Sequence, residues 1–149
     1  MIAKTLLLLS AVLIFLQAGD NSSVKITSWT FYFAKTPFMS GGENDPPGPR
    51  ELEVKPNREL MIAVTYEGQP PSVSTLQVRT AQGVQREYQH EVQESRDAFT
   101  PTVNLGSQFV VPVSDLIADA DAGPIEAEFY YSDANGISDL KLGTITLKW

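Results

Sequence analysis

The chain of 149 residues contains no cysteine and a single histidine, His90. Without cysteine it forms no disulfide, and a thiolate nucleophile or a cysteine-ligated metal site is excluded. The histidine lies in a stretch of alternating Gln and Glu, and the sequence holds no GxSxG, HExxH or phosphate-cradling glycine loop. We therefore interpret His90 as a surface residue, and we predict a protein that is not an enzyme and needs no cofactor.

Extended apolar runs are missing after the first residues of the chain. The one such run, Leu6 to Leu16, follows Lys4 and precedes small residues. It is shorter than the roughly 20 residues that a membrane-spanning helix needs, and its flanks are typical of a secretory signal peptide rather than of an uncleaved anchor. We predict a signal peptide at 1–19 and a single exported domain at 20–149, secreted or periplasmic, with no membrane insertion after cleavage.

Basic residues are scarce, with 11 Lys and Arg against 18 Asp and Glu. Cleavage of the leader removes Lys4 alone, so the exported part carries 10 − 18 = −8. Between Arg96 and Lys141 there are eight acidic residues and no basic one. An acidic surface repels phosphate backbones, which argues against nucleic-acid binding. Solubility accounts for the charge, and binding of a cation or a basic partner is the alternative.

The rest of the chain consists of short segments with apolar residues at every second position, separated by Gly, Pro, Asn and Asp. This period is typical of half-buried β-strands. The charged segment 84–92 has the composition of an edge strand. The predicted strands cover residues 24–33, 52–54, 60–66, 73–80, 84–92, 103–113, 125–131 and 140–149.

Two of these strands carry signs of irregularity. In the first, the apolar parity changes between Ile26 and Trp29, which predicts a bulge near Thr27-Ser28 and a bend that carries the strand from one sheet to the other. In the last strand, Gly143 predicts a second bulge. Asn135-Gly136 predicts a tight hairpin turn before that last strand, because these residues adopt positive φ readily.

Two connections stand out. Residues 35–50 hold four Pro and three Gly, and we predict a long loop without helix or regular strand pairing. Within it Phe38 and Met39 are isolated apolar residues, so we expect them, with Arg50, to contact a partner, or else to fold back as a lid over the open end of the domain. Farther along, Ser114 followed by an acid predicts the start of a short helical turn over 114–121.

The layout resembles the immunoglobulin-like and fibronectin-III-like superfold. Three features carry the resemblance: Leu52-x-Val54 and Leu60-x-Ile62-x-Val64 around a turn, the crossing over 114–123, and the hairpin from Phe129 to Trp149. The resemblance implies an all-β, antiparallel, two-sheet Ig-like sandwich of seven to nine strands over most of 20–149. The paired core cysteines of antibody domains are absent, and a fold this widely reused implies no particular activity.

Two groups of acidic residues have spacings that could suit a metal site or a hydrolase. Asp133, Asn135 and Asp139 have the spacing of the first half of a calcium loop, but the second half is missing, so we interpret them as a plain turn and predict no metal site. Glu126 and Glu128 share one strand face, where a polar surface needs such residues in any case. A hydrolase with two carboxylates would require them to lie in a deep cleft.

These observations favour an exported, non-enzymatic binding or assembly module that presents loops and sheet edges to a protein or glycan. A row of exposed aromatic side chains on one sheet face would indicate sugar stacking. One alternative is a structural subunit of an envelope complex or fibre that adds a strand to a neighbour. The other is the carboxylate-dependent hydrolase.

Overall fold

The computed structural model describes residues 25–67, 71–91, 106–117 and 123–149. The predicted signal peptide, 1–19, lies outside these ranges. Within them, no helix has the length and apolarity needed to cross a membrane. The described elements are β1 (Lys25–Phe33), β2 (Thr36–Gly41), β3 (Arg50–Glu53), β4 (Glu59–Glu67), β5 (Val73–Thr80), β6 (Gln85–Glu91), β7 (Gly106–Pro112), α2 (Val113–Ile117), β8 (Ile125–Asp133) and β9 (Leu140–Lys148).

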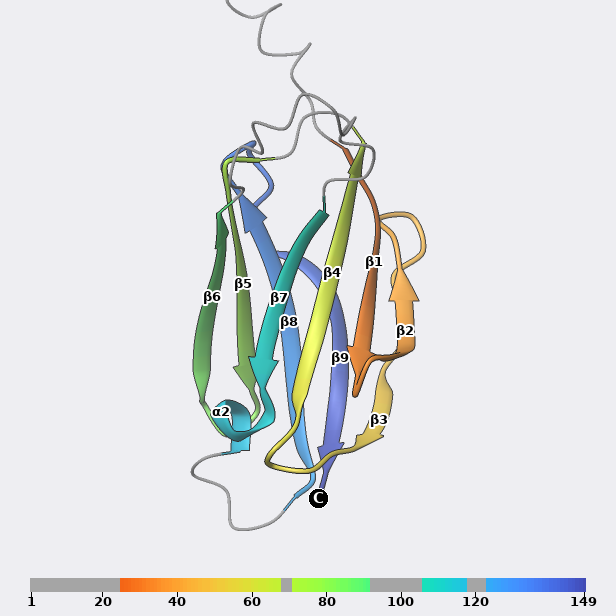
Figure 1. Ribbon diagram of the computed structural model, residues 1–149, viewed down its shortest axis with the longest axis vertical. Coiled ribbons are helices and arrows are strands. Elements are labelled where there is room, and N and C mark those ends of the chain that lie inside the picture. The colour runs from red at the N-terminus through yellow and green to blue at the C-terminus, as the bar shows by residue number, and fades with distance from the viewer. Residues whose placement is uncertain (1–24, 68–70, 92–105, 118–122) are drawn as a thin grey trace, which may run out of the picture.

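The strands form two sheets that pack face to face (Figure 1). One sheet has four strands in the order β2-β1-β4-β7, and the other has five in the order β3-β9-β8-β5-β6. All neighbours are antiparallel except β3 and β9, which run parallel. The prediction of an all-β fold with two mostly antiparallel sheets and seven to nine strands is confirmed.

The core fills the space between the sheets with alternate residues of the inner strands. In β4 the side chains of Leu60, Ile62 and Val64 are fully buried, and their neighbours in sequence are partly exposed. Across the interface Phe31 meets Phe129 edge to face, with ring centroids 5.2 Å apart. Such burial contributes about 25 cal/mol for each Å² of apolar surface, and it holds this cysteine-free chain together.

Both predicted bulges are present. The register of β1 against β4 shifts between Ile26 and Ser28, so that Ile26 and Trp29 both point into the core. The expected crossing of β1 to the second sheet is wrong, because β1 pairs with β4 on both sides of the bulge, which by itself reverses the parity. In β9 the register shifts at Leu142, directly before Gly143. A Cβ at Gly143 would lie 2.7 Å from Met39 Cε, so a larger residue there would require the end of the Met39 side chain to move.

The strands predicted on either side of residues 55–58 are present but belong to different sheets. β3 pairs with β9, whereas β4 pairs with β1 and β7. The Arg58 amide donates to the Lys55 carbonyl at 3.0 Å, which closes the turn between them. This turn therefore carries the chain from one layer of the fold to the other.

The predicted loop at 35–50 is partly wrong, because β2 occupies Thr36–Gly41 and pairs with β1. β2 is an edge strand, where Pro37 can lie without removing a needed backbone donor. The register also shifts beside Pro37, between the β1 residues Phe31 and Tyr32. The other three prolines of the segment follow β2, so the predicted irregular structure applies to the second half alone.

The short helix and the edge strand are close to their predicted places. α2 starts at Val113, so Ser114 lies in its first turn rather than before it, and the predicted end at 121 falls outside the described residues. The Tyr88 hydroxyl of β6 donates to the Asp115 carboxylate at 2.8 Å and ties α2 to that strand. β6 is an edge strand, as its charge predicted.

Candidate binding site

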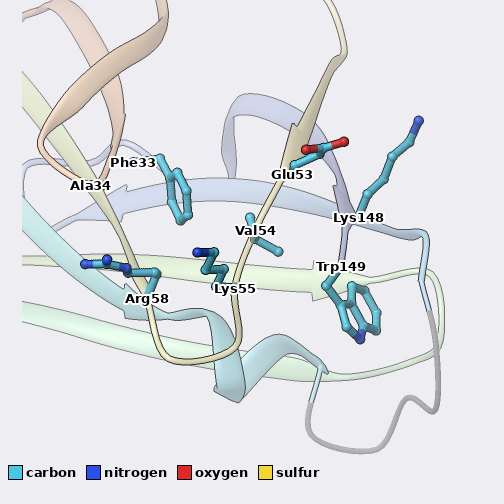
Figure 2. A pocket seen from close by; sticks show the side chains of 8 residues that line it. All are labelled: Phe33, Ala34, Glu53, Val54, Lys55, Arg58, Lys148 and Trp149. Atoms are coloured by element: carbon cyan, nitrogen blue, oxygen red, sulfur yellow. The ribbon is translucent and has the colours of Figure 1, made fainter.

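A pocket of about 620 Å³ opens at the end of the molecule where β1, β3 and β9 finish (Figure 2). Three segments that are far apart in the sequence meet there: the turn after β1, the turn after β3, and the residues that end β9. The parallel pairing of β3 with β9 brings the last two together. The lining residues are Phe33, Ala34, Glu53, Val54, Lys55, Arg58, Lys148 and Trp149.

The charge of the pocket is opposite to that of the chain. Three cationic side chains and one acidic side chain, that of Glu53, line it, whereas the whole chain carries −7. Lys148 Nζ lies 2.8 Å from Glu51, so this cation already has a partner. Lys55 and Arg58 are exposed, and no ion pair involves them within the described residues. These two side chains are the available positive charges of the site.

The remaining surface of the pocket is apolar. Trp149 is 38% exposed, Phe33 is half-buried, and Val54 is buried behind them. In Figure 2 the Lys148 side chain points away from the other lining residues, while Lys55 and Arg58 lie on the opposite side of Val54. An apolar surface beside a few polar groups is the usual composition of a ligand site. This arrangement suits a ligand with an anionic group on an apolar body.

The turn that borders the pocket is held in an unfavourable backbone conformation. Ala34 and Lys35 join β1 to β2, and both have positive φ, at 49° and 66°. A two-residue hairpin turn of this kind normally takes Asn or Gly, and an ordinary side chain costs roughly 1 kcal/mol at each such position. Strained turns gather at functional sites, so this observation supports the pocket independently of its charge.

The predicted contact residues do not line this pocket. Met39 is 3% exposed and belongs to the core, where it packs over Gly143. Phe38 is half-buried, with its ring centroid 6.2 Å from that of Phe31. Arg50 is exposed at the start of β3. Of the three, Met39 is unavailable to a partner because the edge strand β2 turns it inward.

Sequence reasoning missed Lys55 and Arg58, which appeared there as parts of a turn. Their signal is a pair of cations in one short turn of an acidic chain. That signal becomes specific only when two aromatic residues are placed in the same pocket: Phe33, which precedes Lys55 by 55 − 33 = 22 residues, and Trp149, which follows it by 149 − 55 = 94 residues. The sequence alone does not place them there.

The acidic turn after β8 is satisfied by its own neighbours. Asp133 Oδ1 accepts hydrogen bonds from the amides of Asn135 and Ile137, at 2.9 and 3.1 Å, and Oδ2 accepts one from the Tyr131 hydroxyl at 3.0 Å. Asp139 lies 3.4 Å from Arg79. The predicted hairpin is confirmed, since this turn joins the antiparallel strands β8 and β9. Among the described residues, no three acidic or histidine side chains gather as a metal site would require.

A buried set of hydroxyls joins the two sheets near this turn. Tyr66 is hydrogen bonded to Ser107 at 2.6 Å and also to Tyr131, and Ser107 is hydrogen bonded to Ser74 at 2.6 Å. Tyr131 continues the network to Asp133. Burial raises the pKa of Tyr66 and of Tyr131 above the usual value for tyrosine. These hydroxyls are hydrogen bonded to one another and to Asp133, so their burial is explained without a ligand. We interpret them as a hydrogen-bonded link between the two sheets.

Glu126 and Glu128 lie outside the pocket. Both face outward from β8, opposite Thr146 and Thr144 of β9. The Tyr130 hydroxyl donates to Glu128, and this hydrogen bond lowers the pKa of that carboxyl. Lys141 Nζ lies 3.6 Å from the same carboxylate. The two glutamates therefore belong to a polar sheet surface.

A scan of the chain against models of protein families finds no match, and no curated protein matches it. The fold and the pocket define a class nonetheless: an all-β protein of two packed sheets with a basic, aromatic-lined pocket at one end. What such a protein does has to be argued from the site itself.

Proposed function

We propose that the protein is an exported, non-enzymatic binding module with an Ig-like sandwich, and that its end pocket holds the anionic group of a ligand. One observation carries the proposal: Lys55 and Arg58 are exposed and line the same pocket as Trp149, in a chain of net charge −7. The two packed sheets and the crossing between β3 and β4 support the Ig-like assignment. Side chains that already neutralise one another would offer no such site.

The ligand that suits these residues is an acidic glycan. A uronic acid residue carries a carboxylate, which Lys55 and Arg58 can bind by charge-assisted hydrogen bonds. It also presents the apolar face of a rigid ring, which suits the exposed indole of Trp149. An acidic peptide side chain supplies the carboxylate but reaches the indole with a flexible aliphatic stem alone. We therefore place acidic glycans ahead of acidic peptides.

The structure gives less support to the two alternatives. Strand addition needs an open edge, and each edge is protected: β2 contains Pro37, β3 has four residues with two glutamates, β6 is charged, and β7 lies next to β6 and ends at Pro112. A hydrolase of the two-carboxylate type needs a pair of acids about 5 to 9.5 Å apart in its cleft. Among the described residues, Glu53 supplies the single carboxylate side chain that lines the end pocket.

Fluorescence titration with a galacturonic acid trimer tests the proposal, with the same trimer as its methyl ester for comparison. Trp29 is buried and donates to the Leu142 carbonyl at 2.8 Å, so a change on binding reports Trp149. We expect saturable binding of the acid but not of the ester. We expect the double variant Lys55→Gln, Arg58→Gln to bind about tenfold more weakly or worse.

The matched control is Lys25→Gln, which removes one exposed cation at the opposite end of β1. Its affinity should stay within about twofold of the parent, since charges separated by more than the Debye length of about 8 Å are largely screened. Equal binding of the acid and the ester, or equal loss in the control, would refute an anion site at this end. Binding that persists unchanged in the double variant would refute the assignment to Lys55 and Arg58.

A further inference from the structure

The outer face of the four-stranded sheet bears a row of apolar side chains. The strand registers align Pro37 with Tyr32, Tyr32 with Met61, and Met61 with Val110, one residue from each strand. Pro37 is exposed, Tyr32 and Met61 are partly exposed, and Val110 is 49% exposed, which is unusual for a valine in a strand. We call this row and the one beside it the neutral face.

The adjacent row is polar but uncharged. It aligns Ser40, Thr30, Ala63 and Gln108, and the Ser40 hydroxyl donates to that of Thr30 at 3.3 Å. The two rows together contain no charged residue, although 19% of the chain is charged. In Figure 1 the four-stranded sheet is the nearer layer, and α2 lies at its lower end rather than across it. Among the described elements, none covers the neutral face.

We propose that the neutral face is the contact surface between two copies of this chain. In a two-fold symmetric contact, each patch meets itself, so any charge near the axis would face a like charge. That cost is severe for a chain of net charge −7. A face without charge meets the requirement, whereas a foreign partner would more usually be selected by complementary charges. Its apolar row supplies the surface to be buried.

The size of the face sets the strength of the contact. Four strands spaced by about 4.8 Å give a width of about 19 Å, and two rows that each occupy two residues of about 3.4 Å give a length of about 14 Å. The flat footprint is therefore about 270 Å² per copy, against about 800 Å² of accessible surface per partner in a standard interface. We expect a weak dimer, which forms in the range from tens of micromolar to millimolar.

Sedimentation velocity on the full-length protein, at concentrations from about 10 μM to about 1 mM, measures this association. Two variants place a cation on the neutral face, Met61→Lys in the inner strand β4 and Val110→Lys in the edge strand β7. The matched control is Gln89→Lys, which is exposed on the edge strand β6 of the other sheet. Thermal unfolding of each variant confirms that the fold is retained.

We expect the parent and Gln89→Lys to dimerise alike, and both face variants to raise the dissociation constant about tenfold or more. Mixing Met61→Lys with Met61→Glu should restore a dimer, because opposite charges then meet across the contact. Added salt should leave the parent dimer intact, since its contact is apolar. A monomer at every concentration would overturn the proposal, and so would a dimer that neither face variant weakens or that Gln89→Lys weakens equally.

Discussion

The two outer faces of the molecule differ in their charge. The four-stranded sheet presents two uncharged rows, in which Tyr32, Met61 and Val110 lie side by side. The five-stranded sheet presents Arg79 over the ring of Tyr130, at 4.2 Å from its centroid, with Glu128 bound to the hydroxyl of that ring. Every ion pair of the described residues involves the five-stranded sheet or the turn beside it.

The inner faces, in contrast, are alike. Both sheets turn aliphatic and aromatic side chains toward one core, at alternate positions of inner strands such as β4, β5 and β8. The difference between the sheets therefore resides entirely in the outward residues, which folding alone leaves unspecified. A surface that faces water gains solubility from charge, so the absence of charge on one face is a feature that folding does not require. This contrast is the reason for assigning a contact to the neutral face.

If the inner faces are equivalent, truncation from either sheet should cost the same. Phe31→Ala in the four-stranded sheet and Phe129→Ala in the five-stranded sheet each remove one ring of an edge-to-face pair. We expect each to lower the free energy of unfolding by about 3 to 5 kcal/mol, measured by urea denaturation. Val110→Ala, on the neutral face, should stay within about 0.5 kcal/mol. A cost confined to one sheet would break the equivalence.

Two adjacent tyrosines separate the inner from the outer environment on a single strand. Tyr131 points inward and is hydrogen bonded to Tyr66 and Asp133, whereas Tyr130 points outward. Tyr131→Phe leaves buried partners short of a hydrogen bond, so we expect a loss of about 1 to 3 kcal/mol in urea unfolding. Tyr130→Phe should cost about 0.5 kcal/mol or less, because water replaces its contact. Equal losses of unfolding free energy in the two variants would show that the buried hydroxyl network stabilises the fold no more than a hydrogen bond on the surface does.

Much of this contrast between inner and outer faces can be predicted from the sequence, because alternate residues of a strand point to opposite faces of its sheet. The alternation in β4 and β8 predicted which side chains are buried, and the parity slip at Thr27 predicted the bulge in β1. The charge of β6 predicted an edge. These are local signals, and each lies within a few consecutive residues. They predict which side chains of a strand are buried, but they do not predict which strands it pairs with.

Sheet membership and the pocket depend on contacts that no local pattern encodes. β3 and β4 are separated by one short turn and still belong to different sheets. The strand β2 was missed because Pro37 reads as a loop residue unless the strand is known to lie at an edge. The pocket requires Phe33, Lys55 and Trp149 to meet: the parallel pairing of β3 with β9 joins the last two, and Phe33 comes from β1 in the other sheet. Their separation in sequence hides the site.

Alkaline titration tests the tyrosines whose pKa is raised chiefly by burial; the pKa of the outward Tyr130 is raised as well, chiefly by its hydrogen bond to Glu128. Burial raises the pKa of Tyr66, Tyr88 and Tyr131, so the folded chain keeps these protons to higher pH than the unfolded chain does. Stability is therefore complete below the unfolded pKa of about 10 and falls as pH rises above it, by roughly 1 kcal/mol per pH unit for each such group. Thermal unfolding between pH 8 and about 11.5 measures the slope. The fall of stability with pH should be shallower in Tyr131→Phe. An unchanged slope would contradict the raised pKa of Tyr131.

The smallest expected effect concerns the charged face itself. Arg79→Gln removes the cation above Tyr130 and the 3.4 Å ion pair with Asp139. Because these groups are exposed, we expect a loss of about 0.5 to 1 kcal/mol in urea unfolding, shrinking as salt is added. Lys25 is exposed and takes part in no ion pair among the described residues, so Lys25→Gln provides the comparison. It should change the free energy of unfolding by less than about 0.5 kcal/mol. A loss of several kcal/mol in Arg79→Gln would contradict this prediction. It would mean that charged groups on the outer face of the five-stranded sheet make a large contribution to stability, which the uncharged face of the other sheet lacks.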